Sequence, residues 1–283
     1  MPTVDIGGIT TNFGVVGDGP PLLMFSPGGF NAVADNWSDL GVYRRIRLLD
    51  ELPRRYTCIV FDRRESGGSG GRVERLTWAH YVAQGRGLLD HLGFDRAHLM
   101  GGCVGCSVVT SFAVAHPERV AGMVLYSPAG GARYRMTSRA RFERHLAYVD
   151  EHGLSGVVEL ARSTDVGFSK DPRLGPWVSV IRDDDAFAAA YGELDPDAYR
   201  VLVTGLARTM FDRDSVPGPE PEDLMLLDVP ALVIPGNDGS HATSAAHHLA
   251  ECLPLAEYWD VPVDEQTAVT APERILAFLD AHS

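Results

Sequence analysis

Gly101-Gly102-Cys103-Val104-Gly105 stands between an apolar run that ends at Gly101 and a stretch, Cys103–His116, with the composition of a helix. A G-x-C-x-G turn between a strand and a helix is the pattern of a nucleophile elbow. The central nucleophile is a cysteine thiol here, whereas a hydroxyl is commoner at that position. The nucleophile of such a turn has a strained backbone, so its flanking positions must be small, and Gly101 and Gly105 meet that requirement. The following helix directs its free N–H groups and positive dipole end at Cys103, which favours a thiolate. The stretch predicts covalent catalysis by a thiol.

Composition excludes several classes of partner. The chain has 283 residues and a formal net charge of -13, whereas nucleic acids and anionic membranes need a basic surface. No apolar run approaches about 18 residues, and Met1–Asp5 lacks the charged-then-apolar pattern of a signal peptide. Four scattered cysteines are too few for a secreted disulfide framework. We expect a soluble cytoplasmic protein, a monomer or homodimer, that acts on a small molecule.

Short apolar runs bounded by turn residues alternate with segments of helical period, which is the pattern of a parallel sheet covered on both faces. Candidate strands are Leu22–Ser26, Cys58–Asp62, His98–Gly101, Gly122–Tyr126, Ala231–Pro235 and Ala256–Asp260, with an antiparallel leader formed by Val4–Ile6 and Thr10–Val16. Candidate helices are Val42–Leu52, Thr77–Leu92, Cys103–His116, Thr243–Leu253 and Ala271–Ala281.

The alternation stops between Pro128 and Asp228, where helical and loop segments follow one another. The candidate helices there are Arg139–His152, Gly156–Arg162, Ala186–Tyr191 and Asp197–Met210. The interval closes in a Pro- and Gly-rich loop, Val216–Pro221. The simplest arrangement is a helical cap, residues 131–224, inserted between two parts of one core, residues 1–130 and 225–283. A cap over the C-terminal edge of a sheet encloses a pocket where the strand-end loops converge.

Four features in order give the sequence its resemblance to the α/β-hydrolase superfamily, specifically to capped esterases and C–C hydrolases. Leu22–Phe30 resembles the strand and loop that provide one oxyanion donor, although the family's histidine before the glycine is absent. Val60–Gly70 resembles the Asp-x-Arg-Gly-x-Gly-x-Ser loop, with Glu65 in place of a small residue. The Cys103 elbow and Val229–Asp238, which resembles the strand that delivers the triad acid, complete the set. The resemblance implies a mostly parallel eight-stranded sheet with helices on both faces and an inserted helical cap.

The resemblance also implies an oxyanion hole and a triad acid. Developing negative charge on the attacked carbonyl needs preorganised donors, and the backbone N–H of Val104 with that of Gly29 or Phe30 would supply them. Asp238 is the candidate acid, just past a predicted strand. The family acid more often lies one residue later, where this chain has Gly239.

The family's general base is missing from its usual place, the loop after the last strand. No histidine occurs between His248 and His282, and counting back from the Glu-Gln pair puts Asp260 in the histidine's position. A desolvated Asp260, favoured in its protonated form by burial, could supply or accept the proton. His241, on the same loop as Asp238, and His80, at the start of a helix, are the substitute histidines.

Other residues carry two interpretations. Arg63 or Arg64 could bind a substrate carboxylate in a bidentate manner, and Arg64 is the family's loop arginine; structural pairing with Asp62 or Glu65 is the alternative. Cys106 forms a Cys-x-x-Cys spacing with Cys103, which is compatible with a redox dithiol, but the glycine pattern is already explained by the elbow. No ligand-spaced His/Cys cluster indicates a metal and no dinucleotide fingerprint indicates an organic cofactor.

These observations predict hydrolysis of a small ester, lactone, thioester or activated C–C bond through Cys103. The missing histidine keeps a second enzyme class open, because a lyase, dehydratase, cyclase or isomerase needs no deacylation by water. A degenerate hydrolase scaffold that only binds a ligand is the third interpretation, since a fold supports many chemistries.

Overall fold

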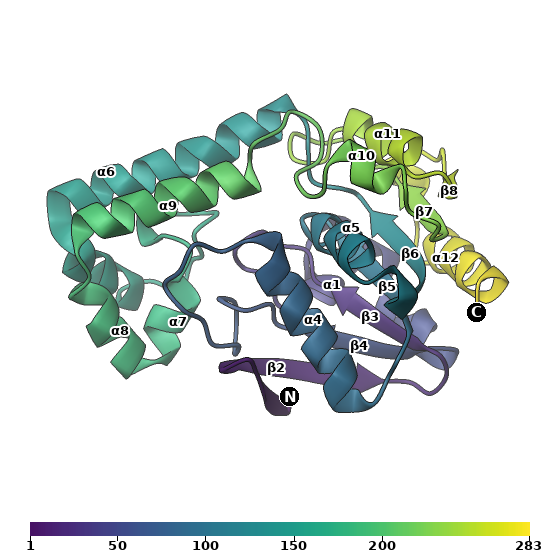
Figure 1. Ribbon diagram of the computed structural model, residues 1–283, viewed down its shortest axis with the longest axis horizontal. Coiled ribbons are helices and arrows are strands. Elements are labelled where there is room, and N and C mark those ends of the chain that lie inside the picture. Colours follow the sequence, from purple (N-terminus) through teal and green to yellow (C-terminus); the bar gives the residue numbers. More distant parts are fainter.

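The computed structural model describes residues 1–283 and contains one eight-stranded sheet (Figure 1). The strand order is β1-β2-β4-β3-β5-β6-β7-β8. β1 pairs with β2, and β2 with β4, in antiparallel fashion, and all other neighbours are parallel. The strands are β1 Thr3–Ile6, β2 Ile9–Val16, β3 Pro21–Phe25, β4 Thr57–Phe61, β5 Ala97–Gly102, β6 Val120–Tyr126, β7 Ala231–Ile234 and β8 Ala256–Tyr258. The predicted fold class, with its antiparallel leader, is confirmed.

Helices cover both faces of the sheet because the parallel strands are apolar on both sides. Leu23 and Phe25 of β3 belong to the larger buried cluster, with side chains of α4, α5, α10 and α11. Leu22 and Met24 belong to the second cluster, with α1, α2, α3 and α12. These helices are α1 Asn36–Asp39, α2 Gly41–Ile46, α3 Leu48–Glu51, α4 Trp78–Leu92, α5 Gly105–Ala115, α10 Pro221–Leu224, α11 Thr243–Cys252 and α12 Thr270–Ala281. Short 3-10 turns are η1 Leu52–Arg54, η2 Pro117–Arg119, η3 Pro172–Leu174 and η4 Val263–Glu265.

The predicted helix Val42–Leu52 is two helices in the structure. α2 ends at Ile46, and Arg47 adopts a left-handed conformation (φ 50°) before α3 begins at Leu48. Because of this break, the side chains of Tyr43, Ile46 and Leu48 all pack into the same buried cluster. In one straight helix, Leu48 would point away from the face that carries Tyr43 and Ile46.

A helical insertion separates β6 from β7 and stands to one side of the sheet in Figure 1, and we call it the cap. It contains α6 Ala132–Arg162, α7 Val178–Asp183, α8 Asp185–Gly192 and α9 Pro196–Met210. α6 joins two helices that the sequence predicts separately, and it bends at Gly153, whose φ of 68° and ψ of 176° are not helical. None of the helices combines the length and the apolar composition needed to cross a bilayer.

Candidate active site

Cys103 occupies the turn between β5 and α5 with φ 56°, a left-handed conformation that a side-chain-bearing residue rarely adopts. The glycines around it are sterically required. A Cβ on Gly101 would lie 2.5 Å from the backbone of Gly105, and a Cβ on Gly105 would lie 2.2 Å from the Phe25 carbonyl oxygen. The G-x-C-x-G pattern therefore follows from the close packing of α5 against the ends of β5 and β3.

The Cys103 side chain faces a cavity of about 320 Å³ between the core and the cap. This volume is at the lower end of the range of roughly 300–1,000 Å³ for small-molecule sites. Phe30, from the loop after β3, packs edge-on against two cap rings, with centroid distances of 5.6 Å to Phe142 and 5.8 Å to Phe168. Aromatic and other large side chains form most of the wall: Phe30, Trp78, Tyr81, Tyr134, Phe142, Phe168, Met210 and Phe211.

His241 lines the same cavity as Cys103, and Asp238 lies behind it on the same loop, outside the cavity lining. His241 Nδ1 is 2.9 Å from both carboxylate oxygens of Asp238, and His241 Nε2 is buried with no regular hydrogen bond. Asp238 also accepts hydrogen bonds from the backbone N–H groups of Ser240 (2.7 Å) and His241 (3.0 Å), which fix the loop. The carboxylate thus orients the imidazole so that Nε2 is left for Cys103.

Electrostatics couples the thiol and the imidazole. Burial alone raises the pKa of Cys103, but the neighbouring charge of His241 and the backbone N–H groups of Val104 and Gly28 bring that pKa below its ordinary value. Burial alone lowers the pKa of His241, and the charge of Cys103, followed by the hydrogen bond and charge of Asp238, raises it to about 9. The opposite shifts favour a thiolate–imidazolium pair near neutral pH.

The position of His241 depends on pairing between two loops. Gly130, after β6, forms an isolated parallel bridge with His241, and its N–H donates to the Ser240 carbonyl (3.0 Å). This contact draws the loop after β7 toward β5, which lies two strands away. Gly236 leaves the necessary room, because a Cβ there would be 2.5 Å from the His241 Cβ.

The backbone N–H groups of Val104 and Gly28 lie near enough to Cys103 to lower the pKa of its thiol. Val104 is an expected oxyanion donor. Gly29 and Phe30 also line the cavity, but Gly28, not named among the sequence candidates, is the residue of that loop that acts on the thiol. The signal for it is steric: Gly28 has φ 126°, and a Cβ there would lie 2.4 Å from Asn31 O and from Asn36 Nδ2.

Asp260 is exposed and does not line the cavity. The sequence-based prediction that a buried Asp260 replaces the missing histidine required this side chain to be shielded from water, and the structure does not shield it. The loop after β8 instead buries Gln266, which accepts a hydrogen bond from the Tyr126 hydroxyl (2.7 Å) and donates to the Pro235 carbonyl (3.0 Å). These bonds hold the loop against the ends of β6 and β7 and leave Asp260 in solvent.

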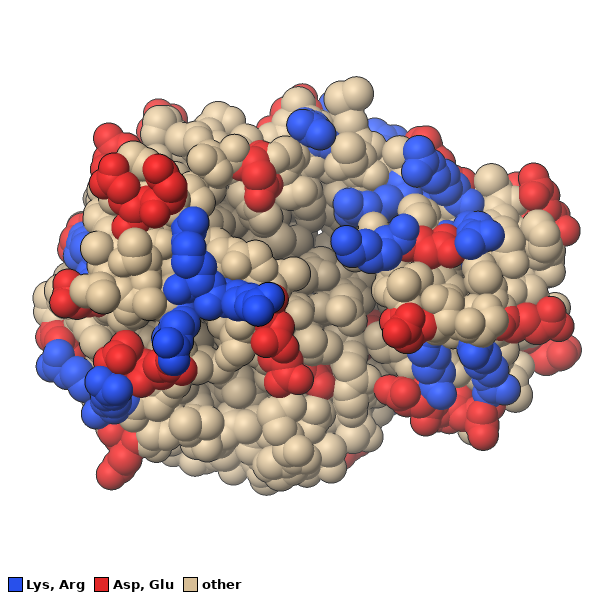
Figure 2. All heavy atoms as spheres, turned by 180° about the vertical axis from the view of Figure 1, so that it is seen from behind, with Lys and Arg blue, Asp and Glu red and all other residues tan.

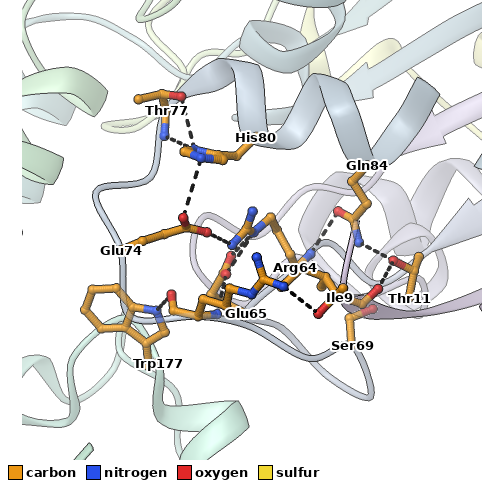
Figure 3. A network of polar contacts seen from close by, with 12 residues as sticks. Ile9, Thr11, Arg64, Glu65, Ser69, Glu74, Thr77, His80, Gln84 and Trp177 are labelled. Atoms are coloured by element: carbon orange, nitrogen blue, oxygen red, sulfur yellow. Dashed lines mark hydrogen bonds and ion pairs between the residues drawn. The ribbon is translucent and has the colours of Figure 1, made fainter. Parts of the chain in front are cut away.

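Arg64 and His80 belong to a polar network beside the cavity and do not line it (Figure 3). Arg64 Nε donates to Glu65 (2.9 Å), and Arg64 Nη2 pairs with Glu74. His80 caps α4, accepting from the Thr77 N–H at 3.0 Å, with its Nε2 3.7 Å from Glu74. The adjacent Arg63, by contrast, is a cavity-lining residue.

Cys106 lies in the core behind the elbow. Its thiol donates to the Gly101 carbonyl at 3.1 Å, and burial, followed by the neighbouring Cys103 charge, raises its pKa well above the ordinary value. A buried protonated thiol of this kind fits packing better than redox exchange. No group of three or more His, Cys, Asp or Glu side chains is arranged to hold a metal ion.

Comparison with known proteins gives one family and several similar structures. The family described as the alpha/beta hydrolase fold matches residues 21–164, just over half of the chain. The 2-hydroxy-6-oxo-6-phenylhexa-2,4-dienoate hydrolase of Comamonas testosteroni is 30% identical over 129 residues, which are 44% of this chain and 42% of that relative. The chain thus spans less than half of the length of this curated relative.

Two crystal structures cover nearly the whole chain. A hydrolase from Pseudomonas aeruginosa PA01 has a TM-score of 0.65 at 19% identity and covers 98% of this chain and 97% of its own. The enol-lactonase from Burkholderia xenovorans LB400 has a TM-score of 0.60 at 18% identity and covers 99% and 97%. At these identities the likeness concerns the fold alone.

Proposed function

Because the chain belongs to the α/β hydrolase fold family, we propose that it is a hydrolase that cleaves a small ester, lactone, thioester or activated C–C bond through Cys103. His241 is the general acid and base, and Asp238 orients it. The observation that carries the proposal is the continuous arrangement at the elbow: the Asp238 carboxylate holds His241 Nδ1 at 2.9 Å, and the thiol and imidazole shift each other's pKa in opposite directions.

The first half-reaction acylates the thiol. The Cys103 thiolate attacks the substrate carbonyl carbon, and the backbone N–H groups of Val104 and Gly28 stabilise the negative charge that forms on its oxygen. The carbon–leaving-group bond then breaks, and His241 Nε2 gives its proton to the departing oxygen, sulfur or carbon. A thioester on Cys103 and a neutral His241 remain.

The second half-reaction consumes one water. Neutral His241 accepts a proton from that water, whose oxygen attacks the thioester carbonyl at the same oxyanion site. The C–S bond breaks, the acid product leaves, and the thiolate–imidazolium pair is restored. Asp238 remains ionised throughout; its side chain is 65% exposed, against 21% for His241, which suits an orienting role better than proton exchange.

Hydrolysis of p-nitrophenyl esters of different acyl length tests the proposal. We expect turnover by the wild type, none above background for Cys103→Ala, and a loss of about 100-fold or more for His241→Ala. Asp260→Asn, in the exposed loop, is the matched control and retains wild-type kcat. Intact-mass measurement of His241→Ala after mixing shows an acyl adduct on Cys103, because acylation precedes the step that needs a base.

Two results would overturn the proposal. If Asp260→Asn lost turnover while His241→Ala kept normal activity, the general base would be Asp260, in the loop after β8, and not His241. No ester turnover, combined with rapid alkylation of Cys103, would favour lyase, isomerase or ligand-binding chemistry on the same scaffold.

A further inference from the structure

Arg63 is a buried guanidinium in the cavity wall that forms no ion pair with the protein. The residue is 4% exposed, and its Nε and Nη1 atoms are buried without a hydrogen bond. Its Cζ lies 4.5 Å from the centroid of the Tyr81 ring, another lining residue. The ring face offers attraction of about 2 kcal/mol at best and accepts none of the directed N–H bonds. A buried charge is expensive unless it is paired and hydrogen-bonded.

The protein's nearby carboxylates are already engaged. Glu65, beside Arg63 in sequence, bonds to Arg64 and accepts from the Arg72 N–H. Asp62 accepts from the Ala34 and Gly68 N–H groups and from Asn12. Arg63 is thus the member of the Asp62–Glu65 loop that lines the cavity, and its Nε and Nη1 atoms have no acceptor within the protein.

The whole cavity is cationic, although the protein carries a net charge of -13. Its lining includes Arg63, Arg141 and Lys170 and not one aspartate or glutamate. None of these three side chains forms an ion pair with a carboxylate of the protein. Figure 2 shows basic side chains gathered on the cap side of the hollow between the two halves of the molecule.

Arg63 and the nucleophile face the same space. Both residues belong to the lining of one cavity, together with Tyr134 and Arg141. Ser138, one helical turn after Tyr134, adds another buried polar atom without a regular hydrogen bond, its Oγ, to the lining. The rest of the lining includes the aromatic rings of Phe30, Phe142, Phe168 and Phe211, which pack against one another.

We propose that the cavity recognises an acyl substrate that carries a free carboxylate, bound by Arg63, at the far end of an apolar segment from the carbonyl that Cys103 attacks. The planar fork of the guanidinium donates two parallel hydrogen bonds to the carboxylate oxygens. Arg141 and the exposed Lys170, the single lysine of the chain, attract the anion to the entrance. The position of the attacked carbonyl rests on the proposed function, whereas the binding of a carboxylate by Arg63 does not.

A pair of matched ester series tests the carboxylate preference. One series contains mono-p-nitrophenyl esters of adipic, pimelic and suberic acids, and the other contains neutral p-nitrophenyl alkanoates of equal chain length. We expect the wild type to prefer the best anionic ester about tenfold or more in kcat/KM. Arg63→Met abolishes this preference, measured as the ratio of kcat/KM between the two series, and Arg63→Lys restores part of it. Arg86→Met, an exposed arginine on α4, leaves the preference unchanged.

Binding to Cys103→Ala separates the anion site from the chemistry. Calorimetric titration compares 4-phenylbutyrate with its neutral amide, which has nearly the same shape. The carboxylate binds about tenfold or more tightly than the amide to Cys103→Ala, and equally weakly when Arg63→Met is added. A preference in binding without ester turnover would leave the anion site standing and overturn the hydrolytic function.

Equal kcat/KM for the two series, together with equal affinity for acid and amide, would overturn the anion site while the hydrolase assignment stands. A preference that survives Arg63→Met would also overturn it, because the charge would then come from elsewhere. Thermal unfolding of Arg63→Met keeps the comparison interpretable: removal of an unpaired buried charge is expected to leave the melting temperature unchanged or higher.

Discussion

At the scale of single residues, Cys103 is the proposed nucleophile, a thiol at the position where a hydroxyl is commoner, and its surroundings favour ionisation. The charge of His241 and the backbone N–H groups of Val104 and Gly28 lower the pKa of its thiol. Its other nearby thiol, Cys106, is kept neutral by burial. One thiolate among four cysteines is therefore expected to react at neutral pH, since Cys58 and Cys252 also have raised pKa values from burial.

The pH dependence of alkylation tests this pair. In the wild type, the rate of Cys103 modification by iodoacetamide reaches half of its maximum below the pKa of about 8.5 of an ordinary thiol. The rate falls as pH drops through the lowered pKa of Cys103, because the thiolate is lost. His241→Ala removes the main favourable charge and moves the midpoint upward. Stopped-flow alkylation measures both, and an unchanged midpoint in His241→Ala would contradict the coupling.

At the scale of elements, the loop between β7 and α11 carries both Asp238, the proposed acid, and His241, the proposed base. Asp238 and His241 are three residues apart, and Gly130 of the loop after β6 pairs with His241. Thr243, the first residue of α11, anchors the other end through a hydrogen bond to the Gly236 carbonyl at 2.9 Å. Backbone contacts on both sides therefore position His241.

Gly236→Ala is expected to displace His241 without unfolding the protein. The added Cβ would lie 2.5 Å from the His241 Cβ and 3.3 Å from the Ser127 Cβ, so the histidine must move away from Cys103. We expect kcat for the best p-nitrophenyl ester to fall about 10- to 100-fold, as misplaced catalytic groups cause. Gly239→Ala, in the same loop, meets only the flexible Arg133 side chain and is the control. Equal activities of the two variants would refute the steric argument.

At the scale of the whole molecule, a buried polar network joins the loop after β4 to the cap. The Trp177 indole N–H of the cap donates to the Arg72 carbonyl at 2.8 Å, while Glu65 pairs with Arg64 (Figure 3). Glu65 replaces the small residue of related loops and has φ 66°, a strained left-handed conformation. Its burial raises its pKa to about 7, against which Arg64 acts only partly.

This network makes stability depend on pH in a defined direction. The folded state holds the Glu65 proton more tightly than the unfolded chain, so its contribution to the free energy of unfolding is fully present below pH 4.5 and is lost as pH rises through about 7. Urea unfolding of the wild type and Glu65→Gln at about pH 5 and about pH 8 isolates the effect. Relative to the variant, the wild type is expected to lose stability between these values, and a pH-independent difference would contradict the assignment.

Much of the fold could be predicted from the sequence, because buried parallel strands appear as continuous apolar runs. The turn at Cys103 could be predicted because its close packing requires glycines on both sides. The eight predicted strands match those of the structure to within a few residues. The choice of His241 over Asp260 could not be predicted from the sequence, because His241 is held near Cys103 by a contact between two loops, its pairing with Gly130. Arg63 and Arg64 are adjacent in sequence but point in different directions, which no periodicity reveals.

The placement of Asp238 and His241, the proposed acid and base, in one short segment changes how this site can be inherited. When a triad draws its acid and its histidine from two loops, both loops must be preserved together. Here one deletion, of the stretch between Gly236 and Thr243, would remove the complete proposed proton-handling pair. Its transfer to another scaffold would in addition need a partner for His241 in the place of Gly130.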